Sequence, residues 1–90
     1  MVLERDIEKY LVKRVKSVGG EVRKVRWIGR RGCPDRLVLL PWMAVWVELK
    51  RPGKKPTAQQ QRELIKLTRA GHPAYCINSF MAVDAMFPCQ

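Results

Sequence analysis

The most apolar stretch of the sequence, residues 37–47, is interrupted by Pro41 and bounded by an acidic residue near each end. Asp35 lies two residues before the stretch, and Glu48 follows it directly. A buried strand face normally excludes an unpaired carboxylate, because the carboxylate loses its hydration there. These two acids therefore either lie on a solvated face or hold a ligand. The stretch is too short to cross a bilayer, and its proline favours a turn between two strands.

Alternation along the second of these strands decides which side chains share a face. In residues 44–50, Glu48 and Lys50 point away from the face that carries the alternating apolar residues. If the hairpin closes around residues 41–44, Asp35 comes close to Glu48. Neighbouring carboxylates repel each other unless a cation lies between them, and oxygen ligands suit Mg²⁺ or Mn²⁺. A lysine beside such a metal could stabilise charge that develops on a phosphate.

The simpler alternative is structural. Glu48 and Lys50 could form a surface ion pair, while Asp35 ends a turn after Pro34. Short patterns of an aspartate followed by Glu-x-Lys occur often by chance, so spacing alone leaves both interpretations open.

Length and charge limit the possible functions. Ninety residues favour a single domain, residues 1–90, and the 47% hydrophobic content is typical of a globular chain. Eighteen Lys and Arg against eight Asp and Glu give a formal net charge of +10. So much positive charge on a small domain favours a polyanionic partner, most plausibly nucleic acid, although an anionic membrane surface would also satisfy it.

The cysteines and the N-terminus indicate the compartment. Cys33, Cys76 and Cys89 show no CxxC spacing, which favours reduced thiols over a disulfide scaffold or a zinc site. Charged residues begin at Glu4, so the N-terminus does not resemble a signal peptide. We expect a soluble cytoplasmic protein, with no membrane partner and no small-molecule cofactor.

Periodicity and turn residues predict the order αβββαβα. Apolar residues at helical spacing predict a first helix over residues 3–18, ended by Gly19 and Gly20. Thr57, followed three residues later by Gln60, matches a capping box and predicts a second long helix through Arg69. The strands are expected at residues 21–28, 36–40, 44–50 and 74–78, and a closing helix at residues 80–87. The fold class is α/β, with helices packed on a mixed sheet.

Several of these segments together resemble the PD-(D/E)XK nuclease superfamily. The match is closest to its virus-type replication-repair nuclease (VRR-NUC) branch, including small phage or viral members. The similar segments are the GCPD loop at residues 32–35, the Glu-Leu-Lys end of the strand at residues 48–50, and the Thr-x-x-Gln helix start at residues 57–60. The first helix and the last strand are also similar. The resemblance implies a restriction-endonuclease-like αβββαβ core with a mixed central sheet flanked by helices.

The resemblance also implies roles for individual residues. Asp35 and Glu48 would bind the metal together with the backbone carbonyl of Leu49, and Lys50 would be the catalytic lysine. A glutamate of the first helix commonly completes such sites; Glu8 is the favoured candidate here, and Glu4 is the alternative.

Two further groups are candidates around the site. Gln60 shares a helix face that should point towards the sheet, and a role only as the capping partner of Thr57 is an equally good interpretation. Gln61 is inward instead if the helix starts one residue later. Basic residues in the two loops beside the proposed site are the natural phosphate contacts: Arg30, Arg31, Lys54 and Lys55.

The expected function is a Mg²⁺- or Mn²⁺-dependent DNA endonuclease that cuts branched DNA, in particular four-way (Holliday) junctions, as a homodimer. The two-fold symmetry of a four-way junction favours two identical sites. Large apolar residues near the hairpin turn and the C-terminus offer a dimer contact: Trp42, Met43, Met81, Met86 and Phe87. The alternatives are a non-catalytic basic module that binds nucleic acid and, less favoured, a small regulatory interaction domain.

Overall fold

The computed structural model describes residues 1–87, and Cys89 lies outside this range. Seven elements follow one another in the predicted order αβββαβα. Their bounds are α1 Glu4–Ser17, β1 Glu21–Lys24, β2 Arg36–Leu40, β3 Met43–Leu49, α2 Ala58–Arg69, β4 Ala74–Ile77 and α3 Phe80–Asp84. No helix within the described residues is both long and apolar enough to cross a membrane.

The four strands form one mixed sheet in the order β1-β2-β3-β4. β1 pairs antiparallel with β2, and β2 pairs antiparallel with β3 through a tight turn at Pro41 and Trp42. β3 and β4 are parallel, so the chain must cross over between them, and α2 lies in that connection. The sheet is therefore a three-stranded meander extended at one edge by a parallel strand.

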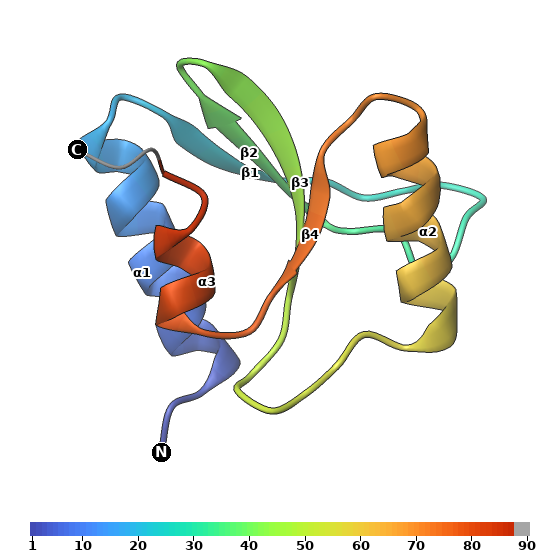
Figure 1. Ribbon diagram of the computed structural model, residues 1–90, viewed down its shortest axis with the longest axis horizontal. Coiled ribbons are helices and arrows are strands. Elements are labelled where there is room, and N and C mark those ends of the chain that lie inside the picture. Colours follow the sequence, from blue (N-terminus) through green and yellow to red (C-terminus); the bar gives the residue numbers. More distant parts are fainter. Residues whose placement is uncertain (88–90) are drawn as a thin grey trace.

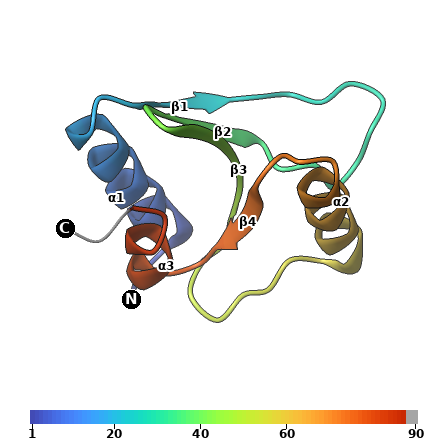
Figure 2. The same ribbon diagram turned by 45° about the horizontal axis from the view of Figure 1, so that its top comes forward.

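Helices cover both faces of the sheet. α1 and α3 lie side by side on one face and α2 lies on the other, as Figures 1 and 2 show. The main core lies on the side of α1 and α3, where Ile7, Leu11 and Val15 of α1 are completely buried. Alternate strand residues close this core, among them Val38 of β2 and Val47 of β3. The predicted α/β class and its mixed central sheet are confirmed.

The predicted capping box at the start of α2 is present. The Thr57 hydroxyl accepts a hydrogen bond from the Gln60 backbone N–H at 3.2 Å, and the Gln60 carboxamide oxygen accepts one from the Thr57 N–H at 2.9 Å. The two reciprocal bonds satisfy backbone donors that a helix start leaves unpaired. They fix where α2 begins relative to the loop that precedes it.

The strand predicted over residues 21–28 is shorter in the structure. β1 ends at Lys24, because β2 begins opposite it at Arg36 and offers no further ladder partner apart from one bond from the Val25 N–H to the Asp35 carbonyl at 2.9 Å. The chain then leaves the sheet. Trp27 anchors this departure: its ring lies 5.1 Å from that of Trp46, and its indole N–H donates to the Pro34 carbonyl at 2.8 Å.

The closing helix is also shorter than predicted, because α3 ends at Asp84 rather than at residue 87. Phe87 is nevertheless 8% exposed and belongs to the core. The Trp42 and Phe87 rings form a T-shaped pair with centres 6.2 Å apart, and the Arg14 guanidinium lies 4.4 Å from the Phe87 ring centre. Phe87 is therefore not available for the dimer contact predicted from the sequence. Cys33 and Cys76 are free thiols, as expected.

Gly32, in the loop between β1 and β2, has a positive φ of 77° and lies directly against the first turn of α2. A Cβ at this position would come within 2.7 Å of Gln59 Cγ and 3.2 Å of its backbone carbon. Only glycine combines that backbone conformation with so close an approach. The loop that ends in Asp35 is thereby pressed against α2.

We expect Gly32→Ala to destabilise the protein more than Gly29→Ala, which is the matched control. Gly29 has a similar φ of 79° but nothing within 4 Å of its Cβ position. Both substitutions carry the penalty of a left-handed alanine, about 1–2 kcal/mol. Gly32→Ala adds overpacking against α2 of about 1–3 kcal/mol. Urea unfolding of the two variants measures the difference, and equal losses would contradict the close packing.

Candidate active site

The hairpin register brings Asp35 and Glu48 together. Arg36 pairs with Val47 across β2 and β3, so the next position along the antiparallel ladder sets Asp35 opposite Glu48. Side chains directly opposite each other point to the same face, with Cβ atoms about 5 Å apart. This face is the one that α2 covers, because Glu48 alternates with the core residues Val47 and Leu49. The two acids that bound the apolar stretch thus meet at one end of the hairpin.

The environment of Glu48 disfavours a negative charge on its carboxylate. The residue is only 9% exposed, and no hydrogen bond to its carboxylate occurs among the described residues. Burial raises the pKa of the Glu48 carboxyl to about 7; Lys50 opposes the rise, while the charges of Asp35 and Glu4 add to it. The site thus holds a carboxyl whose charged form lacks a sufficient partner within the chain.

Lys50 and Cys76 complete the immediate surroundings of Glu48. The backbone N–H of Lys50 donates to the Ile77 carbonyl at 3.0 Å, which extends the parallel ladder one residue beyond β3 and fixes the chain there. Cys76 lies beside Glu48 in the register of β3 and β4. Burial and the Glu48 charge both raise the pKa of the Cys76 thiol, so it remains a neutral neighbour.

The structure separates the two glutamates proposed for the first helix. Glu8, which the sequence favours as the third metal ligand, is held by the Arg36 guanidinium, whose Nε lies 2.6 Å from Glu8 Oε2. Glu4 is exposed in the first turn of α1, and its charge is among those that raise the pKa of Glu48. Of the two, Glu4 is therefore the one whose charge acts on Glu48.

Gln60 is half-buried, and its carboxamide oxygen is engaged by the Thr57 N–H. The alternative in which this residue serves as a capping partner is thus observed. Gln61 is exposed, so a later helix start that would turn it inward does not occur. Gln59 is the glutamine that contacts the site loop: its Nε2 lies 3.4 Å from both the Arg31 carbonyl and Glu63 Oε1.

The four basic loop residues differ in their surroundings. Arg31, Lys54 and Lys55 are exposed, whereas Arg30 donates to Glu63 Oε1 at 2.6 Å. Glu63 is only 4% exposed, and the Arg30 guanidinium holds the pKa of its carboxyl below the usual value. Arg30 therefore ties the site loop to α2, which gives it a structural partner that the sequence did not predict.

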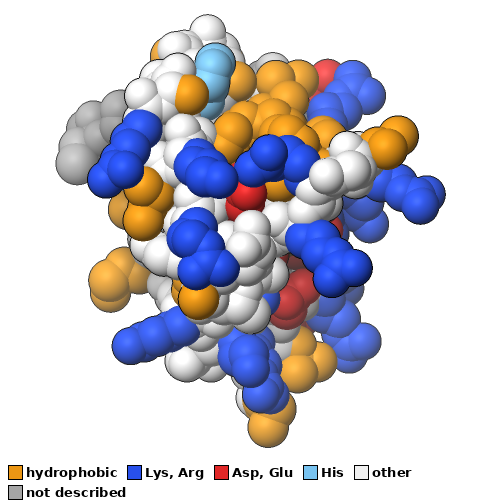
Figure 3. Space-filling model, turned by 90° about the vertical axis from the view of Figure 1, so that its right-hand side faces the viewer, with side chains coloured by type: hydrophobic (Ala, Val, Ile, Leu, Met, Phe, Trp, Pro, Cys, Tyr) orange, Lys and Arg blue, Asp and Glu red, His pale blue; other side chains and the backbone are white. Residues whose placement is uncertain are grey.

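Positive charge dominates the side of the molecule that α2 forms. Figure 3 shows Lys and Arg side chains spread over this face, around a few recessed acidic side chains. α2 itself contributes three exposed cations, Arg62, Lys66 and Arg69. An acidic site within a basic surface suits a phosphate ligand that is bound through a cation.

The sequence did not single out three residues that shape the site: Arg36, Gln59 and Glu63. Arg36 directly follows Asp35 and opens an apolar strand, which was the available signal for a buried, paired charge. Glu63 and Gln59 lie on one face of α2, and the structure is needed to identify their partners in the loop.

Within residues 1–87, no three carboxylate, imidazole or thiol groups gather closely enough to form a metal cluster by themselves. The arrangement offers two opposed carboxylates, Asp35 and Glu48, which backbone carbonyl oxygens and water would have to complete. Hard divalent cations such as Mg²⁺ bind in this way, through one or two carboxylates and several waters.

This fold, with opposed carboxylates on neighbouring strands and a lysine two residues beyond the second, defines the PD-(D/E)XK class of nucleases. Comparison with known proteins narrows the class, although no family model matches the chain. "Putative nuclease p44" of Acyrthosiphon pisum secondary endosymbiont phage 1 is 45% identical over 80 residues, which cover 88% of this chain and 86% of that protein. A solved structure described as "VRR_NUC domain" is 35% identical with a TM-score of 0.84, and the match covers 96% of this chain and 95% of the other. The chain belongs to the VRR-NUC family, as the resemblance of its motifs implied.

Glu48→Gln should make the metal-free protein more stable at neutral pH. The Glu48 pKa is raised from 4.5 to about 7 in the folded state, so the folded protein retains a proton that the unfolded chain releases between these values. The contribution of Glu48 to wild-type stability therefore falls as pH rises from about 4.5 to about 7, by at most about 3.4 kcal/mol at 1.36 kcal/mol per pH unit. Glutamine does not ionise and lacks this loss.

Urea unfolding in EDTA at pH 4.5, 6 and 8 measures this difference. Titrations that the two proteins share cancel in the comparison, including that of Glu63, whose lowered pKa acts with the opposite sign. The stabilisation by Glu48→Gln should grow with pH and level off above pH 7. A difference that does not depend on pH would show that Glu48 carries no burial penalty.

Proposed function

We propose that the protein is a metal-dependent, structure-selective DNA endonuclease that hydrolyses phosphodiester bonds with Mg²⁺ or Mn²⁺. The observation that carries the proposal is the pair formed by Asp35 and Glu48. Glu48 is nearly buried, and the negative charges of Asp35 and Glu4 act on it. A bound cation would stabilise its ionised form. Asp35, Glu48 and the carbonyl of Leu49 would hold the metal, and Glu4 would complete its surroundings in place of Glu8.

The residues of the chain divide the chemistry among them. A divalent cation held by these residues would supply positive charge for the scissile phosphate and would make a water molecule a better nucleophile. Asp35 and Glu48 fix where that charge lies. The Lys50 ammonium, whose charge acts on Glu48, stabilises negative charge as it develops on the phosphate oxygens. Gln60 supports the site indirectly through the start of α2.

Asp35→Ala and Glu48→Ala should each reduce DNA cleavage by roughly 10²-fold or more, since each removes a metal ligand and its electrostatic contribution. DNA binding should stay equal or become tighter, because a negative charge near phosphate is lost. Lys50→Ala should abolish cleavage while the protein still binds Mn²⁺. Cleavage of a labelled branched substrate with Mn²⁺ or EDTA, with parallel binding assays at low salt, measures both properties.

Glu21→Ala is the matched control, because Glu21 is an exposed carboxylate on β1 that pairs with the exposed Arg23. It should leave cleavage unchanged. If Asp35→Ala, Glu48→Ala and Lys50→Ala all cleaved DNA as fast as the wild type, the active site would lie elsewhere. Binding without metal-dependent cleavage in the wild type would identify a non-catalytic nucleic-acid-binding module instead.

We further propose that the exposed loop cations Arg31, Lys54 and Lys55 contact the DNA backbone. Arg31 belongs to the loop that ends at Asp35, and the lysines belong to the loop that follows Lys50, so both loops leave the site directly. The second loop is partly fixed, because Asn78 Nδ2 donates to the Lys54 carbonyl at 3.1 Å. Phosphate contacts of this kind position DNA without reading its sequence.

Arg31→Glu, Lys54→Glu and Lys55→Glu should weaken binding to all DNA sequences alike. Each lost phosphate contact should reduce the slope of log affinity against log salt by about 1. Arg30→Glu serves as the contrast: it should lower the free energy of unfolding, because it places a second acid beside buried Glu63. Fluorescence anisotropy at several salt concentrations and thermal melts separate these effects, and a sequence-selective loss would instead indicate base contacts.

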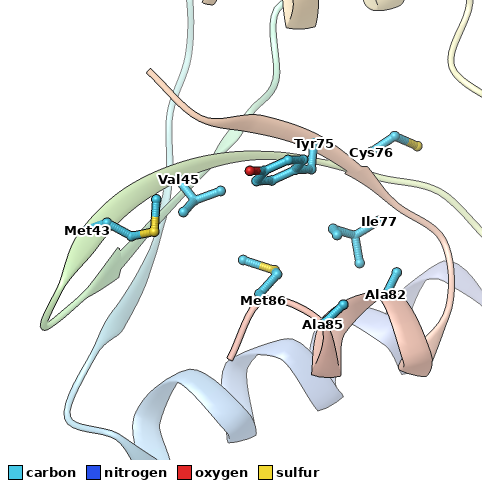
Figure 4. Close-up of a pocket in the computed structure, with 8 residues that line it drawn as sticks. All are labelled: Met43, Val45, Tyr75, Cys76, Ile77, Ala82, Ala85 and Met86. Carbon is cyan, nitrogen blue, oxygen red and sulfur yellow. The ribbon is translucent and has the colours of Figure 1, made fainter. Parts of the chain in front are cut away.

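We propose, finally, that the protein acts on four-way junctions as a homodimer. One active site cuts one strand, whereas a symmetric junction presents two equivalent strands to a two-fold dimer. An apolar groove of about 490 Å³ lies on the face of the sheet that carries α3, beside the edge strand β4. Figure 4 shows Met43, Tyr75 and Met86 pointing into this groove, with Cys76 directed away from it.

Exposed apolar side chains favour this groove as the contact. Tyr75 is 50% exposed and Met43 is 38% exposed. Met81, which belongs to the adjacent helix α3, is 81% exposed. Trp42 also remains partly exposed, although its ring packs against that of the buried Phe87. Apolar groups left open around a groove of this kind are typical of a protein interface.

Wild-type protein should sediment as a dimer at micromolar concentration and make paired, symmetric incisions in a four-way junction. Tyr75→Glu should yield a monomer that no longer makes paired cuts, because a carboxylate would be buried in an apolar contact. Ile28→Glu is the control, since Ile28 is 92% exposed outside the groove and undergoes the same change from apolar to acidic. A monomeric wild type that degrades linear duplex but leaves junctions intact would contradict the assembly and the substrate, and not the metal site.

A further inference from the structure

Arg36 contacts two carboxylates, that of Glu8 and that of Asp35. Its Nε and Nη2 lie 2.6 and 2.5 Å from Oε2 of Glu8 on α1. Its Nη1 lies 3.0 Å from Oδ2 of Asp35 and 3.4 Å from the Asp35 carbonyl oxygen. One guanidinium thus joins the first helix to the carboxylate at the start of β2.

The Arg36 and Asp35 side chains differ in exposure. The Arg36 side chain is 13% exposed, whereas that of Asp35 is 59% exposed. An exposed carboxylate can turn freely about its side-chain bonds, and a metal site loses affinity when its ligands are not held in place. The planar fork of an arginine, itself fixed by burial, is suited to hold such a carboxylate in one orientation.

The contact leaves half of Asp35 available. Arg36 engages Oδ2, and among the described residues the other oxygen, Oδ1, accepts no hydrogen bond. A cation shared with Glu48 can therefore take one oxygen of Asp35 without breaking the ion pair. Glu8 in turn holds Arg36, so its carboxylate acts on the site through Arg36.

We propose that Arg36, anchored by Glu8, is a positioning residue that orients the Asp35 carboxylate for the metal. The inference rests on the metal site proposed above and assigns Glu8 a role as support rather than as a ligand. Arg36 touches neither substrate nor metal in this scheme. Its contribution is to restrict Asp35 to an orientation in which one oxygen stays free.

Electrostatics alone predicts the opposite outcome on removal of this residue. A guanidinium beside a divalent cation repels it, so deleting the charge should tighten metal binding if orientation were irrelevant. A purely structural role for Arg36 would lower stability and leave the metal affinity of the folded protein unchanged. Because the Arg36 charge also lowers the pKa of Glu48, weaker Mn²⁺ binding by folded Arg36→Lys, which keeps a positive charge, is the outcome specific to positioning.

The test is a calorimetric titration of Mn²⁺ into wild type, Arg36→Gln, Arg36→Lys and Glu8→Gln, with folding verified by circular dichroism and thermal melts in EDTA. Arg36→Gln should weaken Mn²⁺ binding roughly 10-fold or more, as is usual for groups that support metal ligands. Arg36→Lys keeps the charge but loses the fork, and should also bind more weakly. Arg23→Gln, which removes an exposed arginine that pairs with Glu21, is the matched control and should bind like the wild type.

The double variant separates support from ligation. If Glu8 acts through Arg36, Glu8→Gln should weaken Mn²⁺ binding alone and add nothing in the Arg36→Gln background. Additive losses would make Glu8 a ligand and overturn its assigned role. Unchanged or tighter binding by folded Arg36→Gln, with normal binding by the wild type, overturns the positioning of Asp35. Absence of Mn²⁺ binding by the wild type removes the proposed metal site itself, and this inference with it.

Discussion

The register between β2 and β3 is the constraint on which the site depends. The tight turn at Pro41 and Trp42 pairs Leu40 with Met43, and every later pair follows from it. Side chains alternate between faces, so a slip of one residue would turn Glu48 into the core and Val47 towards α2. The fully buried Val38 and Val47 oppose such a slip, because it would expose them. The packing of the core thereby sets the position of the two carboxylates.

Charge is distributed in opposite ways at two scales. The chain as a whole carries a formal charge of +10, yet the negative charges of Asp35 and Glu4 both act on Glu48 at the end of the hairpin. In the proposed function, the surrounding cations attract DNA, and the acidic centre would repel phosphate unless a metal ion lay between them. Such a site should discriminate between binding DNA and cutting it. Binding would then need the basic surface alone, and cleavage would need the cation as well.

Much of the fold could be predicted from the sequence, because its patterns are local. The helical stripe of Ile7, Leu11 and Val15 and the reciprocal cap of Thr57 and Gln60 each depend on residues a few positions apart. The hairpin likewise predicted that Asp35 would approach Glu48, and the register agrees.

Pairings between distant segments could not be predicted in this way. The contacts of Arg36 with Glu8 and of Arg30 with Glu63 span 28 and 33 residues, respectively. They depend on how α1 and α2 dock on the sheet. The burial of Phe87 beneath Trp42 arises similarly, from tertiary packing beyond the end of α3. A charged residue next to a motif therefore could not be assigned as a phosphate contact, a support or a ligand from the sequence alone.

The single parallel pair of strands, β3 and β4, has a consequence for how the protein reaches its native state. The β2–β3 hairpin is local in the chain. β4, in contrast, is separated from β3 by the whole of α2, so their pairing closes a long loop. Local contacts generally form sooner than those that close a long loop. Asp35 and Glu48 should therefore meet early in folding, while the ladder bond that fixes Lys50 to Ile77 must wait for β4. A cation present during folding would then encounter its carboxylates before the lysine is in place.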